Sequence, residues 1–226
     1  MRWFVRPAGA RAAVLLLHGG QEHSTAAARP WQLAAVRMHP FARAVARETV
    51  GSAVAVGQLR YRHRGWNGER ADAARDAAAA LDGLGPEPVL LIGHSMGGRA
   101  ALRVAGHPRV TAVLALAPWC PPEDPCGQLA GRTLVALHGD RDRTTSPADT
   151  RRFAARARAA GAAVAGIEVA GAGHAMLRRS ADWHRATAEL AAGLLGVREL
   201  PAEVRAALAS DRDGTGGLRL ALPPRG

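Results

Sequence analysis

The sequence is poor in the residues that hold small secreted domains and membrane proteins together. Its 226 residues include two cysteines, one tyrosine and three phenylalanines, and aromatic residues make up only 4%. Cys120 and Cys126 lie in one proline-rich segment; this is neither a disulfide framework nor a zinc-binding spacing, so we expect free thiols. No apolar run approaches the roughly 18 residues of a membrane-spanning helix, so we expect no membrane partner. With so few aromatic residues, the core must consist mainly of Leu, Val and Ala.

Lysine is absent: all 30 basic residues are arginine, and against 19 acidic residues they give a net charge of +11. A strongly basic chain is one sign of a nucleic-acid-binding protein. Here the arginines are scattered along the whole chain. We therefore interpret the charge as a bias of composition and expect no nucleic-acid partner.

The first 20 residues resemble a signal peptide only in part. Arg2, Arg6 and Arg11 precede a run of apolar residues that ends at Leu17. The run is shorter than the about 7–15 residues of a signal-peptide core, and no small-residue cleavage site follows it. We predict that it is a buried strand and that the protein is cytoplasmic.

Short apolar runs alternate with helical patterns along the chain. The runs cover residues 13–17, 52–56, 88–92, 111–117, 133–137 and 164–169, with an early strand at 3–6. Apolar runs of about 4–8 residues are typical of strands covered on both faces, as in a parallel sheet. Helical periodicity covers residues 33–48, 69–81, 96–105, 147–160 and 180–195, and Ser146-Pro147 is a typical helix start. The alternation predicts an open α/β sheet with right-handed crossovers.

The pattern weakens after residue 196, where glycine and proline become frequent. The length favours one domain. We predict that residues 1–198 form it and that residues 199–226 form a short helix at 201–209 and a flexible tail.

The strongest local signal is Gly93-His94-Ser95-Met96-Gly97, which matches the G-x-S-x-G pattern of a nucleophile elbow between a strand and a helix. A serine in so tight a turn has strained backbone, so its neighbours two residues away must be small, as Gly93 and Gly97 are. The turn points the Ser95 hydroxyl away from the sheet and puts the Met96 amide at a helix N-terminus, where it is able to stabilise an oxyanion. Neither G-x-x-x-x-G-K-[ST] nor G-x-G-x-x-G occurs, which argues against a nucleotide-phosphate loop.

A serine nucleophile needs a base, and His174 is our candidate. It follows Gly171 and Gly173, directly after the last core strand. Loops at the carboxyl ends of parallel strands share one edge of the sheet, so Ser95 and His174 are expected on the same edge.

The base needs an orienting carboxylate, and two candidates follow the strand at 133–137. We favour Asp142, which is able to reach back over the sheet, and keep Asp140 as the alternative. The carboxylate that is not used is expected to form a surface pair with Arg141 or Arg143.

A second oxyanion donor is expected from the loop after the first core strand, where glycines let the backbone approach a substrate closely. We assign the amide of Gly20, with Gln21 as the neighbouring candidate and as a substrate-binding residue. From the histidines that flank these turns we expect structural hydrogen bonds rather than chemistry: His18, His94 and His138.

These segments together resemble the α/β-hydrolase superfamily. The matching pieces are His18-Gly19-Gly20, the elbow at 93–97, residues 138–142 and Gly173-His174. Their Ser, Asp, His order is the order of that family, and the resemblance extends over residues 14–195. It implies a three-layer α/β/α sandwich with a mostly parallel sheet of about 7–8 strands, a Ser95–His174–Asp142 triad, and hydrolysis through an acyl-enzyme.

Many members of the superfamily insert a lid of tens of residues after the strand that matches residues 111–117. Here only residues 118–132 separate that strand from the next, so we expect no large lid domain. The short loop is similar to that of small esterases, thioesterases and dienelactone-hydrolase-like proteins. Dienelactone hydrolases typically use a cysteine nucleophile, where this chain has Ser95.

Two features near this edge allow two interpretations each. Trp119 either lines the substrate pocket or packs within its loop. Residues 58–66 contain three arginines with Tyr61 and Trp66. They either hold an anionic substrate group or form a solvated loop with arginine stacked on Trp66.

The sequence therefore predicts a serine hydrolase that cleaves a small-molecule ester or thioester and needs neither a metal nor an organic cofactor. An acyltransferase or perhydrolase on the same fold is the first alternative. A non-catalytic binding protein that has kept the fold is the second.

Overall fold

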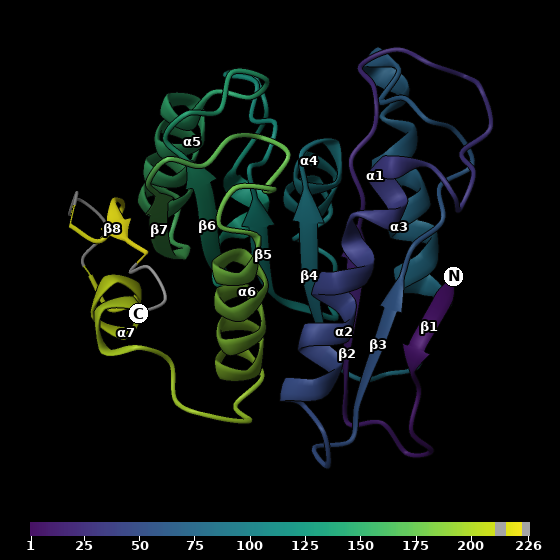
Figure 1. Ribbon diagram of the computed structural model, residues 1–226, viewed down its shortest axis with the longest axis horizontal. Helices are drawn as coiled ribbons and strands as arrows, with labels where there is room; N and C mark the ends of the chain where they lie inside the picture. The colour runs from purple at the N-terminus through teal and green to yellow at the C-terminus, as the bar shows by residue number, and fades with distance from the viewer. Residues whose placement is uncertain (211–215, 223–226) are drawn as a thin grey trace.

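The computed structural model describes residues 1–210 and 216–222. Its strands form one eight-stranded sheet in the order β1-β3-β2-β4-β5-β6-β7-β8 (Figure 1). Strand β1 is antiparallel to β3, and the other neighbours are parallel. The strands span Arg2–Val5 (β1), Ala12–Leu17 (β2), Val54–Gln58 (β3), Val89–His94 (β4), Val110–Leu116 (β5), Thr133–Gly139 (β6), Ala163–Val169 (β7) and Leu220–Ala221 (β8).

The central strands are apolar along their length because both faces of the sheet are covered. In β2, Leu15 and Leu17 belong to one core cluster and Val14 and Leu16 to the other, and all four are buried. Alternate side chains of a strand point to opposite faces, so a continuous apolar run is what a doubly covered sheet requires. The predicted three-layer α/β/α architecture is confirmed.

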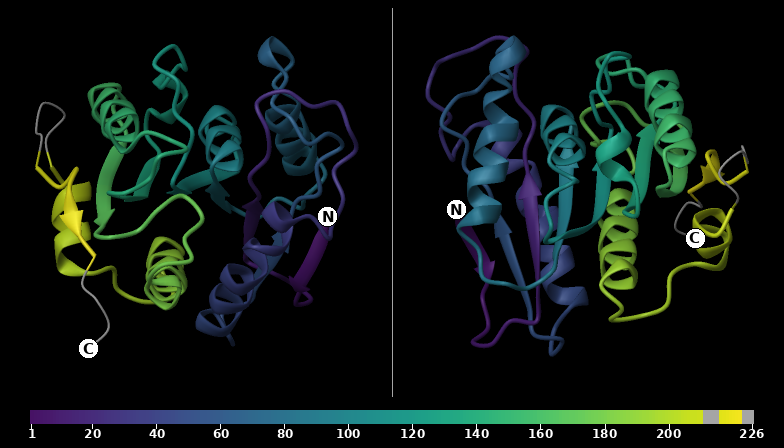
Figure 2. Two further views of the ribbon diagram at one scale, coloured as in Figure 1. Left: turned by 45° about the horizontal axis from the view of Figure 1, so that its top comes forward. Right: turned by 180° about the vertical axis from the view of Figure 1, so that it is seen from behind.

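The helices lie in two layers (Figures 1 and 2). Helices α2 and α6 pack against each other on one face of the sheet, while α3, α4 and α5 cover the opposite face. Ser146 caps α5 as predicted, because its hydroxyl accepts a hydrogen bond from the Asp149 amide at 3.1 Å. The helices span Leu33–Val36 (α1), Met38–Glu48 (α2), Asp72–Asp82 (α3), Met96–Arg103 (α4), Pro147–Ala159 (α5), Ser180–Leu194 (α6) and Ala202–Leu208 (α7).

Two predicted helices differ from the observed ones where the backbone turns. The helix predicted at 33–48 is divided at Arg37 into α1 and α2. The helix predicted at 69–81 begins only at Asp72, because Gly68–Arg70 forms a 3-10 helix (η1) and Ala71 has a φ of 45°. Apolar periodicity continues through such turns and does not reveal them.

The strand predicted at 52–56 begins two positions later, at Val54, because Ala53 has a φ of 52° and belongs to the preceding turn. The segment after residue 198 forms α7 and then β8, which extends the sheet beside β7. A two-residue strand is too short to show a period, so the apolar pattern does not predict β8. Residues 211–215 and 223–226 of the predicted tail lie outside the described residues, and the domain boundary at residue 198 stays a prediction.

The connection between β5 and β6 is short. Residues 117–132, which the structure describes throughout, contain the 3-10 helix Gly127–Leu129 (η2) and turns. The sheet edge beside them therefore has no large lid domain, as predicted. Within the described ranges, none of the helices combines the length and the apolar character needed to cross a bilayer.

Candidate active site

Ser95 lies in the tight turn between β4 and α4. Its backbone has φ 56° and ψ −121°, a conformation that costs a non-glycine residue about 1–3 kcal/mol and persists only where its surroundings enforce it. The turn is closely packed: a Cβ at Gly93 would collide with the Gly97 carbonyl, and a Cβ at Gly97 would collide with the Leu17 backbone. Both glycines are therefore required, for the reason that the motif suggested.

The two residues predicted to donate to an oxyanion lie against each other. Met96 begins α4 directly after Ser95, so its amide belongs to the first turn of the helix. A Cβ at Gly20 would lie 2.6 Å from Met96 Sδ and would collide with the Arg64 carbonyl. The amide of Gln21 already donates to that Arg64 carbonyl at 2.9 Å. Gly20, rather than Gln21, thus remains the candidate donor from this loop.

His174 reaches Ser95 from the loop that follows β7. Its Nε2 atom lies 3.0 Å from Ser95 Oγ, and its Nδ1 atom lies 2.8 Å from Asp142 Oδ2. Because a carboxylate only accepts hydrogen bonds, Nδ1 carries the proton and Nε2 accepts from the Ser95 hydroxyl. Three side chains that are far apart in the sequence therefore form one hydrogen-bonded series.

The Asp142 carboxylate is fully enclosed by donors. Oδ1 accepts hydrogen bonds from the amides of Thr144 at 2.8 Å and Thr145 at 3.0 Å, and Oδ2 accepts from His138 Nε2 at 3.1 Å as well as from His174. Burial by itself raises the pKa of Asp142, but these hydrogen bonds, led by those from the two histidines, outweigh it and hold the pKa far below its usual range. Asp142 is therefore ionised.

Asp140, the alternative carboxylate, has a different partner. Its Oδ1 accepts a hydrogen bond from the Gly171 amide at 2.7 Å, in the loop that carries His174. Among the described residues it forms no ion pair with Arg141 or Arg143, so the expected surface pair was wrong. The Gly171 amide is the donor to Asp140, and this hydrogen bond stabilises the loop that carries His174.

A family model described as "Alpha/beta hydrolase family" matches residues 14–135, which include Gly20 and the turn at Ser95. The chain belongs to the α/β hydrolase family. The match ends before Asp142 and His174, so their assignment depends on the contacts described above. Comparison with curated proteins gave no match.

Several solved structures share the fold of this α/β hydrolase. A protein of unknown function from Agrobacterium tumefaciens is 16% identical, with a TM-score of 0.65 over 88% of this chain and 93% of that one. A monoacylglycerol lipase from Paleococcus ferrophilus is 17% identical, with a TM-score of 0.60 over 82% and 95%. A serine hydrolase without lid from Xanthomonas campestris is 18% identical, with a TM-score of 0.53 over 82% of each chain. At identities of 16–18%, this similarity shows a shared fold and no more than that.

Two histidines of the hydrolase make the structural hydrogen bonds predicted for them. His94 Nε2 lies 3.0 Å from the His174 carbonyl, and the two rings are 4.8 Å apart. Burial, followed by the charge of His174, lowers the pKa of His94 to about 3, so His94 is neutral and donates to that carbonyl. His18 Nδ1 bonds the Gly19 carbonyl at 2.7 Å, and burial lowers its pKa too.

Arg99 is a site residue that the sequence analysis did not identify. Its guanidinium carbon lies 4.1 Å from the Trp66 ring centroid and 4.2 Å from that of Trp119, and it bonds both Asp124 oxygens at 2.6 and 2.7 Å. The four residues line an open pocket of about 340 Å³. The Trp119 amide donates to the Ser95 carbonyl at 3.2 Å, so one wall of this pocket is bonded to the backbone of the Ser95 turn. The available signal was an arginine in a helix segment of Met, Gly, Ala and Leu, since a buried charge needs a partner.

Two arginines bond the loop at residues 58–66 to neighbouring segments of the chain. Arg62 pairs with the Asp76 carboxylate at 2.5 Å, and Arg64 Nε donates to the Ala27 carbonyl at 3.2 Å. The arginine that stacks on Trp66 is Arg99 from α4, so the predicted stacking forms with a residue outside the loop.

The two cysteines are free thiols, as expected. Burial is the main cause that raises the pKa of Cys120 to about 12. Cys120 therefore stays protonated.

Proposed function

We propose that this α/β hydrolase is a serine hydrolase that cleaves a small-molecule ester or thioester through an acyl-enzyme. The observation that carries the proposal is the hydrogen-bonded series from Ser95 Oγ through His174 to Asp142, with contacts of 3.0 and 2.8 Å. Ser95 is the nucleophile and His174 is the base. Asp142 orients the His174 ring and stabilises its protonated form. No cofactor takes part.

The reaction has two steps. His174 Nε2 removes the Ser95 proton while Oγ attacks the substrate carbonyl; the bond to the leaving oxygen or sulfur then breaks as Nε2 returns the proton to that atom. In the second step Nε2 removes a proton from water, whose oxygen attacks the acyl carbon, and Ser95 leaves with the proton. The amides of Gly20 and Met96 donate to the oxyanion in both steps.

We place the substrate beside the pocket that Trp119 and Arg99 line. Trp119 forms part of its wall together with Glu22 and His23. The exposed Gln21, which directly precedes Glu22 in the chain, is the substrate contact that we propose from this loop. The short β5–β6 connection leaves this edge open, which supports entry directly from solvent. The monoacylglycerol lipase with a similar fold supports an ester as the substrate class.

The test is the reactivity of Ser95 toward a fluorophosphonate probe and toward p-nitrophenyl esters of increasing chain length, with thioesters alongside. Ser95→Ala should remove labelling and lower ester turnover by about 10⁴-fold or more, while the protein stays folded. Ser52→Ala, in the turn before β3, is the matched control and should label like the wild type.

The same assay separates the alternatives. Ester turnover that persists unchanged in Ser95→Ala would exclude the assignment. A wild-type protein that neither labels nor turns over any ester would indicate a binding protein on this fold. Transfer of the acyl group to an added alcohol, or to peroxide in preference to water, would indicate an acyltransferase or perhydrolase.

A further inference from the structure

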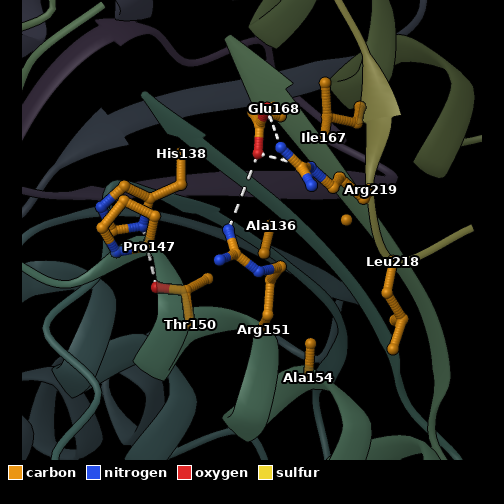
Figure 3. A pocket seen from close by; sticks show the side chains of 11 residues that line it. Ala136, His138, Pro147, Thr150, Arg151, Ala154, Ile167, Glu168, Leu218 and Arg219 are labelled. Carbon is orange, nitrogen blue, oxygen red and sulfur yellow. Dashed lines mark hydrogen bonds and ion pairs between the residues drawn. The ribbon is translucent and has the colours of Figure 1, made fainter. Parts of the chain in front are cut away.

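Asp142 is bonded to two histidines, and the proposed mechanism uses only one of them. His138 Nε2 lies 3.1 Å from Asp142 Oδ2, the same oxygen that His174 contacts. His138 is buried at the end of β6, and its other ring nitrogen, Nδ1, lies 2.8 Å from Thr150 Oγ1 on α5 (Figure 3). The second imidazole therefore connects the carboxylate to a helix that the reaction does not otherwise involve.

The chemistry of the groups fixes the direction of these hydrogen bonds. The ionised Asp142 only accepts, so His138 donates Nε2–H to it. In a neutral imidazole Nδ1 is then the acceptor, and the Thr150 hydroxyl donates to it. Two series of donors thus converge on one carboxylate, one from Ser95 through His174 and one from Thr150 through His138.

We propose that His138, held by Thr150, is a positioning residue that fixes the Asp142 carboxylate opposite His174 and takes up part of its negative charge. This inference rests on the proposed function. The Thr145 hydroxyl also lies 3.0 Å from Oδ2, but it is shared with the Ala117 carbonyl at 3.2 Å, so His174 and His138 are the two ring N–H donors to that oxygen. With the amides of Thr144 and Thr145 on Oδ1 and His138 on Oδ2, the orientation is determined from both ends.

The groups that surround His174 and His138 determine what changes when His138 is replaced. His174 faces Ser95, Thr145, the ionised Asp142 and the neutral His94, on which the charge of Arg37 also acts. Beyond His138 lie Arg151 and Glu168, and Glu168 is bonded to Arg219 at 2.9 Å and paired with Arg151 at 3.6 Å (Figure 3). If the His138 N–H is removed, more of the Asp142 charge acts on the His174 imidazolium and stabilises it. The same loss lets the carboxylate move, which slows proton transfer.

The experiment measures the pH dependence of fluorophosphonate labelling at Ser95, which needs no knowledge of the natural substrate. His138→Leu should lower the plateau rate by about 10-fold, the equivalent of one hydrogen bond to a charged group. The acid limb of its labelling-rate profile should move to higher pH by about 0.5–1 unit. His138→Gln, whose amide nitrogen takes the place of Nε2, should keep the donor and stay within about 3-fold of the wild type.

A second pair of variants tests the same inference at Thr150. Thr150→Val removes the hydroxyl at nearly constant shape and should shift the rate and the acid limb in the same directions by less. Thr150→Ser keeps the hydroxyl and should match the wild type. This pair decides the outcome if His138→Leu does not fold.

Two results overturn the inference alone while the wild type labels normally at Ser95. One is an unchanged labelling rate and an unchanged acid limb in His138→Leu. If His138→Leu does not fold, the same result in Thr150→Val overturns the inference. The other is an equal loss of rate in the Leu and Gln variants with no movement of the limb, which indicates a merely structural role. A wild-type protein that does not label at Ser95 overturns the proposed function and this inference with it.

Discussion

Two clusters of side chains meet at Ser95, and they are built in different ways. One is the series Ser95–His174–Asp142, whose members all lie in turns directly after strands β4, β7 and β6. The other is Arg99 with Trp66 and Trp119, which comes from a helix and from two separate connections and is completed by the Asp124 carboxylate. The Trp119 amide bonds the Ser95 carbonyl and so joins the two.

The difference lies in what fixes each arrangement. The first cluster is held by backbone geometry: glycines that leave no room for a Cβ, and loops that end at one edge of the sheet. The second is held mainly by side chains, through a buried ion pair and two aromatic rings. Substitutions in the first cluster should therefore cost rate and leave the fold, whereas substitutions in the second should cost stability first.

The largest effect is expected at the carboxylate of the first cluster. Asp142→Asn should lower kcat by about 10³–10⁴-fold, because an amide nitrogen facing Nδ1 favours the wrong His174 tautomer. Asp140→Asn is the matched control on the same loop and should lower kcat by no more than about 3-fold, since its carboxylate bonds the Gly171 amide. Steady-state kinetics on the best p-nitrophenyl ester measures both. A larger loss in Asp140→Asn would reverse the assignment.

The next effect concerns the second cluster. Arg99→Met should lower the free energy of unfolding by about 3–5 kcal/mol, because it leaves Asp124 buried without its partner. Both side chains are about one-tenth exposed, at 10% and 11%. Denaturant unfolding measures the loss, and Arg103→Met in the last turn of the same helix, on an exposed residue, is the control.

A double variant sharpens this result. Arg99→Met with Asp124→Leu removes both charges and should recover part of the lost stability, because an apolar pair of similar volume often replaces a buried ion pair at little cost. In both variants KM should rise more than kcat falls, since the pocket wall changes while Ser95 and His174 do not. A loss of kcat without a loss of stability would contradict the distinction between the clusters.

The same distinction explains what was predictable from the sequence. The apolar runs predicted the central strands because a doubly covered sheet leaves no polar face, and the Gly93 and Gly97 spacing predicted the turn because its packing excludes a Cβ. Ser95, His174 and Asp142 were predictable as neighbours because consecutive parallel strands deliver their loops to one edge.

Contacts between distant side chains were not predictable in this way. Nothing local marks Trp66 and Trp119 as the partners of Arg99, since the pairing depends on how α4 is placed against two loops. The break at Ala71 was missed for a related reason. Its positive φ separates η1 from α3, and alanine gives no sign of such a conformation in a helical pattern.

The smallest effect is expected at His94, whose ring lies beside His174. It is an effect on stability that depends on pH, unlike the effect expected at Arg99. Its pKa is lowered to about 3 in the folded protein, against about 6.5 when unfolded, so its neutral form stabilises the fold fully above pH 6.5 and this stability is lost as the pH falls toward 3. Between pH 7 and pH 5 the wild type should lose about 2 kcal/mol more than His94→Gln, which keeps a donor for the His174 carbonyl but does not titrate. Unfolding curves at both pH values measure the difference. Parallel losses in the two proteins would mean that His94 titrates normally, and that the ring beside His174 is more open to water than its burial implies.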